Sequence, residues 1–263
     1  MSQLAHTLII GATSETPAVG SKANVVMAAY TAMQASVRKM VDGENSDEIT
    51  RIVDVIAKEF DCVAVKGMIS HQILKNVIDG PNRIILAPTE AQKKQVESFN
   101  FKTGECYSLD ICISSGVGAT KDSSDRTTIY KRNPNSTYQL KMKTSRAVFS
   151  QVQKQFGMFP FSISQVQDMD LRKSRMGIVE VQAHNLVDVY PHLLIEEDVA
   201  RFVCTVLILP NGPIIVAEIP MCAIDGAIVS EKKVCDAEVI ELLARPLRPK
   251  KSKKPAQVPV PMA

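Results

Sequence analysis

The chain has 263 residues, of which 45% are hydrophobic and 22% are charged, and its formal net charge at pH 7 is +3. This composition predicts a soluble globular protein of the cytosol or nucleus with a large core, because no apolar run approaches the ~18–20 residues of a membrane span. The six cysteines never fall at C-x-x-C spacing, which favours buried free thiols over zinc ligands or disulfides.

Two amphipathic helices are predicted in the first quarter of the chain. In the first, hydrophobic residues recur at spacings of four and three and stop before Gly43, namely Val26, Tyr30, Met33, Val37 and Met40. The second starts at Asn45 or Ser46, where a capping residue precedes two acids. Its buried face is expected to carry Ile49, Ile52, Ile56 and Phe60.

Strands are predicted where segments rich in Val and Ile are bounded by turn residues. The last two of these segments flank Pro210, Asn211 and Gly212 and are expected to form a hairpin. Between residues 143 and 184 the pattern becomes helical, with one helix carrying Val148 and Val152 and a second helix at 162–171. A helical insert is therefore predicted within a mixed sheet domain, whose strand segments are 4–10, 62–65, 83–87, 106–114, 126–132, 201–209 and 214–219.

Positive charge is concentrated in two segments. Residues 121–154 contain eight basic and two acidic residues, a net charge of +6, and aromatic residues lie between them. Such a segment suits phosphate contacts and stacking on unpaired bases, although a solvated charged face is the plainer interpretation. From Arg245 onward six basic residues occur without an acid and are interrupted by prolines, so we expect this tail to be disordered.

Several segments carry a family resemblance. RTTIYKR (126–132), LKMKTSRA (140–147) and TVLILPNGP (205–213) resemble the proliferation-associated, growth-factor-receptor-binding proteins, which are non-enzymatic relatives of type II methionine aminopeptidases. The resemblance extends from about residue 4 to residue 243. It implies the pita-bread α/β (α+β) fold, here mostly its C-terminal half, in a domain of residues 1–243 with the helical insert at about 120–195. A basic, proline-rich tail at 244–263 follows, and an N-terminally truncated chain is expected because residues 1–10 resemble a strand from the middle of the relatives' fold.

The resemblance also implies a degraded metal site. A two-metal hydrolase needs a histidine and bridging carboxylates around its ions. The resemblance matches the metal histidine of the aminopeptidases to His71 and their first metal-binding glutamate to Asp110. Their second aspartate, last bridging glutamate and second cleft histidine match Gln3, Val203 and Asp79. An amide and an isopropyl group cannot bridge two metals. We therefore expect no catalytic residue, no metal, no cofactor and no enzyme activity, with His71 and Asp110 as vestigial ligands; residual metal-dependent methionine aminopeptidase activity is the alternative.

By resemblance, the chain is expected to bind structured RNA and ribosomes in the cytoplasm and the nucleus or nucleolus. Transcription co-regulators and a growth-factor receptor tail are further implied partners. The helix before the tail matches the relatives' L-x-x-L-L partner-binding motif at Leu242 and Leu243, with Val239 in place of the first leucine. Such a stripe could dock in a hydrophobic groove, but it is more often a core face. The expected RNA contacts are the basic residues of both segments, namely Lys121, Arg126, Lys131, Arg132, Lys141, Lys143, Arg146, Lys250, Lys251, Lys253 and Lys254.

Overall fold

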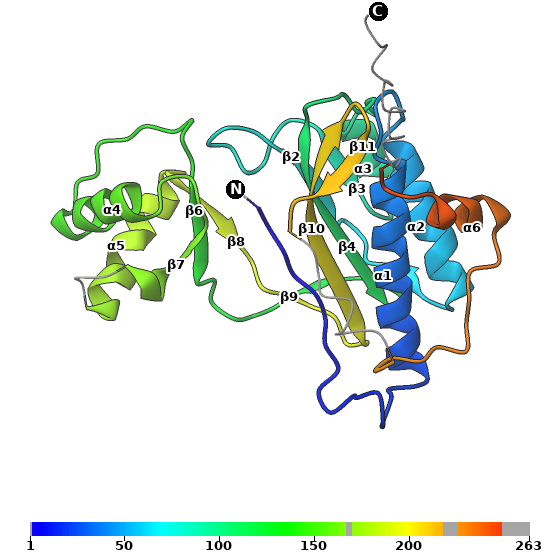
Figure 1. Cartoon of the computed structure of the whole chain (residues 1–263). Helices are drawn as coiled ribbons and strands as arrows, with labels where there is room; N and C mark the ends of the chain where they lie inside the picture. Colours follow the sequence, from blue (N-terminus) through cyan, green and yellow to red (C-terminus); the bar gives the residue numbers. More distant parts are fainter. Residues whose placement is uncertain (1, 167–169, 218–225, 249–263) are drawn as a thin grey trace, which may run out of the picture.

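The computed structural model describes residues 2–166, 170–217 and 226–248 and contains two lobes (Figure 1). The main lobe holds the large sheet and the long helices, and the smaller lobe, here the insert, is formed within residues 121–194. Each lobe has its own cluster of buried hydrophobic side chains. None of the described helices is long and apolar enough to cross a membrane.

A six-stranded antiparallel sheet forms the centre of the main lobe. Its order is β11-β10-β4-β2-β3, with β1 paired to the end of β4. The predicted hairpin is confirmed, because β10 and β11 pair directly across its turn. Gly212 there has φ +105° and lies against the carbonyl oxygen of Leu247, which leaves no room for a side chain. The strands are β1 (Val63–Ala64), β2 (Ile69–Ile73), β3 (Arg83–Ile85), β4 (Cys106–Ser114), β10 (Val199–Leu209) and β11 (Gly212–Ile215).

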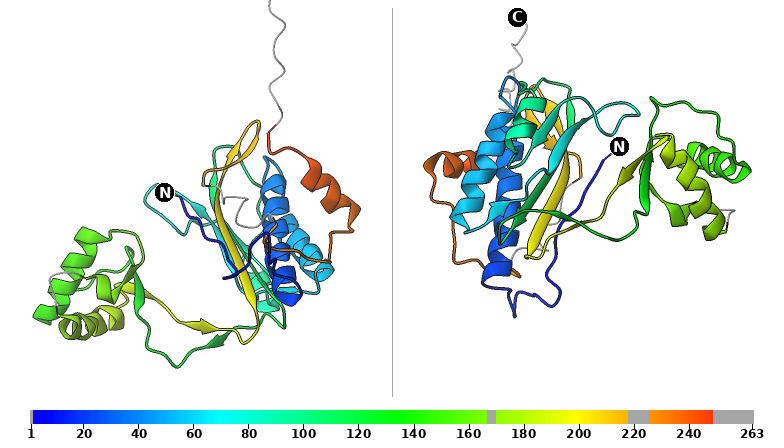
Figure 2. Two further views of the ribbon diagram at one scale, coloured as in Figure 1. Left: turned by 60° about the horizontal axis from the view of Figure 1, so that its bottom comes forward. Right: turned by 180° about the vertical axis from the view of Figure 1, so that it is seen from behind.

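The helices of the main lobe cover one face of this sheet (Figure 2). The two predicted amphipathic helices are confirmed as α1 (Ser21–Lys39) and α2 (Asp47–Glu59). α1 packs on β4 and β10, and α2 packs on α1, β1 and β3. α6 (Ala237–Ala244) packs on the outer side of α1, and the short α3 (Glu90–Gln95) follows β3. Among the described residues, no helix of the main lobe packs on the opposite face of the sheet.

Residues 2–10 run beside β10 but do not form the predicted strand at 4–10. The backbones of Ala5 and Val203 exchange two hydrogen bonds, with N–O distances of 3.0 and 2.8 Å. At the next pairing position the hydroxyl of Thr7 accepts from the Arg201 amide at 2.9 Å and donates to its carbonyl at 3.2 Å. The strand prediction is wrong because this side chain replaces the backbone pairing after a single bridge.

The insert has a small sheet and a pair of helices joined to the main lobe by a two-stranded neck, β5 (Lys121–Asp122) paired with β9 (Leu193–Leu194). Its sheet has the order β7-β6-β8, and its helices pack on each other. Val148, Val152, Ile178 and Val181 lie in their shared hydrophobic cluster. The elements are β6 (Ile129–Arg132), α4 (Lys143–Gln155), β7 (Phe161–Ser162), the 3-10 helix η1 (Ile163–Gln165), α5 (Leu171–Ala183) and β8 (Val187–Tyr190).

Strand ends differ by a few residues from the predicted ranges, and three predictions differ more. The helix predicted at 162–171 is wrong for its described residues, because Ile163–Gln165 forms a 3-10 helix and α5 begins only at Leu171, where the Asp170 carboxylate accepts from the Arg172 amide at 3.2 Å. Residues 167–169 of that prediction lie outside the described residues. The strand at 126–132 is shortened to β6. Order also extends past Arg245, whose carbonyl oxygen accepts from Nε of Arg38 at 2.9 Å. The remainder of the predicted tail, residues 249–263, lies outside the described residues.

Candidate functional site

The face of the sheet opposite α1 and α2 carries the residues that were matched by resemblance to the metal ligands of the aminopeptidases. Side chains alternate between faces along a strand. In β4, Leu109 and Ile111 point into the hydrophobic core of the main lobe, so Asp110 between them points to the other face. In β10, Phe202 and Cys204 likewise point into the core. Val203, which lies directly opposite Asp110 in the strand register, therefore shares its face.

The carboxylate of Asp110 is bound by the guanidinium of Arg201. Nε of Arg201 donates to Oδ1 of Asp110 at 2.9 Å, and Nη2 donates to Oδ2, so the pair is bidentate. Asp110 is buried, whereas about half of the Arg201 side chain is exposed. The hydrogen bond from Arg201 to Asp110 raises the pKa of the guanidinium. Both carboxylate oxygens are thus paired with the positive charge of Arg201 and are not open to a metal cation.

The remaining matched positions do not complete a metal site. The side-chain oxygen of Gln3 accepts a hydrogen bond from the Ser108 hydroxyl, so the amide is engaged with the sheet. His71 lies in β2 opposite Ser108, and its burial lowers the pKa of the imidazole, which favours the neutral form. Within residues 2–166, 170–217 and 226–248, no three His, Cys, Asp or Glu side chains gather where they would hold a metal ion.

Four of the eleven basic residues predicted to contact RNA are exposed on the insert beyond its neck. Arg126, Lys141 and Lys143 are exposed. Arg146 is also exposed, and its Nη1 donates to the carbonyl oxygens of Leu140 at 3.0 Å and Lys141 at 2.8 Å. These two bonds fix the loop that leads into α4, so the exposed lysines at the start of that helix have a defined backbone.

Three other predicted contacts are not equally available. Lys121 is exposed but pairs with Glu196 at 2.8 Å. Arg132 is partly buried, and its Nε atom is inaccessible to solvent. Lys131 is buried and paired with Asp79, so the expectation that it contacts RNA is corrected for this arrangement of the lobes. The last four predicted contacts lie outside the described residues, namely Lys250, Lys251, Lys253 and Lys254.

Comparisons with known proteins identify the family, although no protein-family model matches the chain. The chain is 38% identical over 261 residues to the curved DNA-binding protein of Schizosaccharomyces pombe, covering 98% of this chain and 66% of that protein. It is 35% identical over 248 residues to proliferation-associated protein A of Dictyostelium discoideum, covering 93% of this chain and 62% of that protein. The chain belongs to the proliferation-associated protein family. It spans about two-thirds of the length of these relatives.

A solved structure agrees with this assignment to the proliferation-associated family. The structure of a thermophilic Arx1 matches with a TM-score of 0.80 and 27% identity, covering 89% of this chain and 67% of that chain. The predicted α/β pita-bread fold class is thereby confirmed.

The residues of α6 that were expected to bind a partner are not presented to solvent in this structure. Val239 and Leu242 of α6 are 1% and 5% exposed and belong to the core of the main lobe, and Leu243 packs against it. Ile240, on the other side of the helix, is exposed. The expectation that Val239, Leu242 and Leu243 form a docking stripe is corrected, because their side chains already pack within the main lobe.

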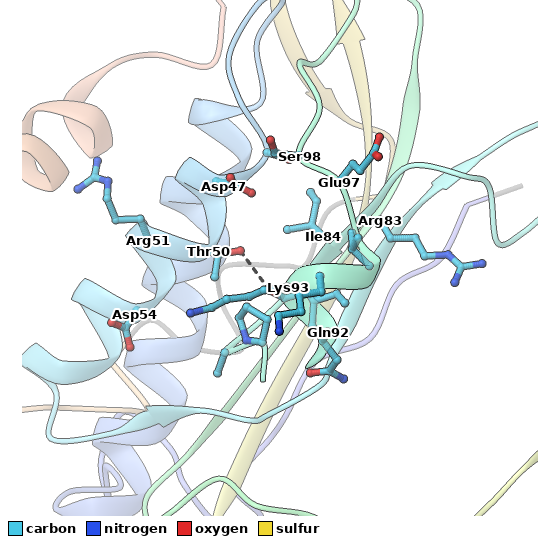
Figure 3. Close-up of a pocket in the computed structure, with 16 residues that line it drawn as sticks. Asp47, Thr50, Arg51, Asp54, Arg83, Ile84, Gln92, Lys93, Glu97 and Ser98 are labelled. Carbon is cyan, nitrogen blue, oxygen red and sulfur yellow. Dashed lines mark hydrogen bonds between the residues drawn. The ribbon is translucent and has the colours of Figure 1, made fainter. Parts of the chain in front are cut away.

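A pocket of about 820 Å³ lies between α2 and the segment from β3 to the end of α3 (Figure 3). It is on the helix-covered side of the main lobe, away from Asp110. The Thr50 hydroxyl donates to the Ile85 carbonyl oxygen across it at 3.1 Å. Its charged residues come from different elements and do not converge on one point, so it does not form a catalytic constellation. They are Asp47, Arg51, Asp54, Arg83, Lys93, Lys94 and Glu97.

Sequence reasoning missed Arg201 as the residue that decides the state of Asp110. The sequence contained part of this information. Arg201 and Val203 are two positions apart in one strand, so their side chains lie on the same face. The strand register was needed to bring Arg201 near Asp110. In this chain the Asp110 carboxylate is therefore held in an ion pair within the protein.

Proposed function

We propose that this chain binds structured RNA and, through it, ribosomes, and that it has no aminopeptidase activity. The observation that supports RNA binding is the exposed basic surface of the insert. Arg126, Lys141 and Lys143 carry unshielded positive charge there, and phosphate backbones are bound by several such side chains that release condensed counterions. α5 adds the exposed Arg172, Lys173 and Arg175. A nucleic-acid partner is also supported by the name of the Schizosaccharomyces pombe relative, curved DNA-binding protein.

The proposal that the chain is not an enzyme is supported by the pair of Arg201 and Asp110. A catalytic divalent metal needs free carboxylate oxygens and bridging ligands. Here both oxygens of Asp110 accept from Arg201, and the position opposite Asp110 is Val203. Metal binding would require the guanidinium to leave. The other positions matched by resemblance then offer the imidazole of His71 and the amide of Gln3, with the apolar Val203 opposite Asp110.

Further parts of the proposal come from the family resemblance. We place the chain in the cytoplasm and the nucleus or nucleolus, with growth-regulatory roles that include transcription co-regulation and binding to a growth-factor receptor tail. The unit that binds RNA is residues 1–243 with its insert at about 120–195, assisted by the lysines of the tail at 244–263. Because α6 is packed on the main lobe, receptor or co-regulator binding through Val239, Leu242 and Leu243 requires that helix to detach.

Filter binding to a structured RNA hairpin over a series of salt concentrations tests the proposal. The variant Lys141→Glu with Lys143→Glu reverses two exposed charges of the insert. Lys66→Glu with Lys102→Glu makes the same charge change on exposed residues of the main lobe. We expect the insert variant to bind more weakly and its log–log salt slope to fall by about one for each lost phosphate contact, with the control close to the unmodified chain. Equal losses in both variants, or no salt dependence, would refute binding through the insert.

The alternative of a residual methionine aminopeptidase has its own test. Isothermal titration with Mn²⁺ or Co²⁺ and hydrolysis of a peptide with N-terminal methionine are measured on folded protein. We expect neither stoichiometric metal binding nor release of methionine. Metal-dependent turnover that is lost in Asp110→Asn would establish the enzyme and overturn this part of the proposal.

A further inference from the structure

Lys131 of the insert is a buried lysine. Its side chain is 5% exposed, and its Nζ atom makes an ion pair with Asp79. A second carboxylate, that of Asp188, lies 3.8 Å from the same atom. Removing an ammonium group from water is strongly unfavourable unless opposite charges compensate it. The position of Lys131 therefore depends on its two acids.

The two acids belong to different lobes. Asp188 lies in β8 directly opposite Lys131 in β6, so this contact is internal to the insert. Asp79 belongs to the loop between β2 and β3 of the main lobe, which extends toward the insert in Figures 1 and 2. This loop is held to its own lobe, because the Gly80 amide donates to the Gln72 carbonyl oxygen at 2.8 Å. The ion pair of Lys131 with Asp79 thus connects a strand of the insert to an anchored loop of the main lobe.

The covalent connection between the lobes is slender. The chain enters and leaves the insert through the neck of β5 and β9, which pair over two residues each. The ion pair in the neck, Lys121 with Glu196, joins two exposed side chains, and such pairs contribute little in water. A two-stranded ribbon without a packed face resists bending weakly. The orientation of the insert is therefore expected to depend on contacts made away from the neck.

We propose that Lys131 and Asp79 form a latch that fixes the insert against the main lobe, and that its opening lets the insert pivot on the neck. When the latch is closed, Lys131 is sequestered from external anions. When it is open, Lys131 is free to join the exposed basic residues of the insert. The closed latch also sets the distance between the insert and the open face of the sheet that carries Asp110. This inference concerns the geometry of the lobes and stands independently of RNA binding.

Double electron–electron resonance, which measures the distance between two spin labels, tests the latch in the full chain. One label is placed on Cys235, an exposed native cysteine of the main lobe, and the other on Gln155→Cys, an exposed position at the end of α4. Cys106 and Cys222 are replaced by serine to prevent further labelling. We expect one narrow distance distribution for the unmodified latch and a broader, shifted distribution for Asp79→Asn.

Matched variants distinguish loss of the ion pair between the lobes from loss of an ion pair within the insert or its neck. Asp188→Asn removes the acid within the insert, and Lys121→Met removes the exposed ion pair of the neck; both are expected to retain the narrow distribution. Lys131→Met keeps an unbranched stem without its charge and is expected to broaden the distribution as Asp79→Asn does. Amide exchange in residues 74–80 should also accelerate by about tenfold in Asp79→Asn, the factor for a loss of about 1.4 kcal/mol. Narrow, unchanged distributions in both Asp79→Asn and Lys131→Met would overturn the latch.

Discussion

Arg201 reaches diagonally across the pair of β10 and β4 to Asp110. In the strand register Arg201 lies opposite Cys112, and Asp110 lies opposite Val203, so the guanidinium spans one diagonal step to make its two hydrogen bonds. Long side chains reach such diagonal neighbours on a shared face. The pair accounts for how the buried carboxylate of Asp110 is compensated in this fold.

Restoring the carboxylate opposite Asp110 should restore weak metal binding. In Arg201→Ala with Val203→Glu, Asp110 is released and a glutamate lies directly across the strand pair, with Cβ atoms about 4.5–5.5 Å apart. We expect Mn²⁺ binding by isothermal titration in this variant and none in the unmodified chain. Arg201→Ala with Val203→Gln is the isosteric control, and equal binding by both variants would contradict the assignment of these positions.

Loss of Arg201 alone should destabilise the fold. Arg201→Ala leaves Asp110 buried without its charged donor, which destabilises the folded state. Because about half of the Arg201 side chain is solvated, the effect is reduced, and we expect the free energy of unfolding to fall by about 1–2 kcal/mol. Urea denaturation followed by circular dichroism measures it. Arg201→Lys should recover part of the loss, since one of two hydrogen bonds remains possible. An unchanged unfolding midpoint in Arg201→Ala would mean that the pair contributes nothing.

Alanine substitutions on the two sides of α6 should show whether the helix is part of the core or free to dock with a partner. Leu242→Ala removes a side chain buried against the main lobe and is expected to cost about 2–4 kcal/mol of stability. Ile240→Ala alters an exposed side chain of the same helix and should change stability by no more than about 0.5 kcal/mol. Thermal denaturation of both variants provides the comparison. Similar small effects would indicate that α6 is detached in solution.

The cysteines should differ sharply in reactivity toward a thiol-specific reagent at pH 8. Burial raises the pKa of Cys62 to about 11 and the pKa values of Cys112 and Cys204 to about 12. At pH 8 no more than about one Cys62 thiol in a thousand is a thiolate, so these three should react slowly in the folded protein. Cys235 is exposed and should react fast. Mass spectrometry locates the labelled cysteines. Fast labelling of Cys62, Cys112 or Cys204 in the variant Cys235→Ser would contradict their burial.

The sequence predicted elements well where local pattern and packing agree. The spacing of apolar residues in α1 and α2 and the turn residues before Gly212 identified those elements, because each depends on a helix face or a tight turn. The region at 162–171 failed because Ile163 and Val166 pack into the cluster of the insert from a strand end and a single 3-10 turn, not from a helix. Buried positions in irregular segments imitate helical periodicity over so short a span.

The candidate site was predictable only in part. Asp110 and Val203 were identified by resemblance, and the structure places them opposite each other. The pairs of Arg201 with Asp110 and of Lys131 with Asp79 join residues 91 and 52 positions apart, respectively. Neither follows from local pattern, since each depends on strand register or on the placement of two lobes. A count of basic residues therefore included Lys131 although its charge is compensated inside the protein.

Photocrosslinking of a structured RNA to the full chain, with crosslinked peptides mapped by mass spectrometry, tests the central claim most directly. Binding through basic residues of the insert predicts crosslinks concentrated in residues 126–146 and 171–176, diminished by high salt and by Lys141→Glu with Lys143→Glu. Crosslinks confined to the main lobe, or unaffected by that charge reversal, would contradict it.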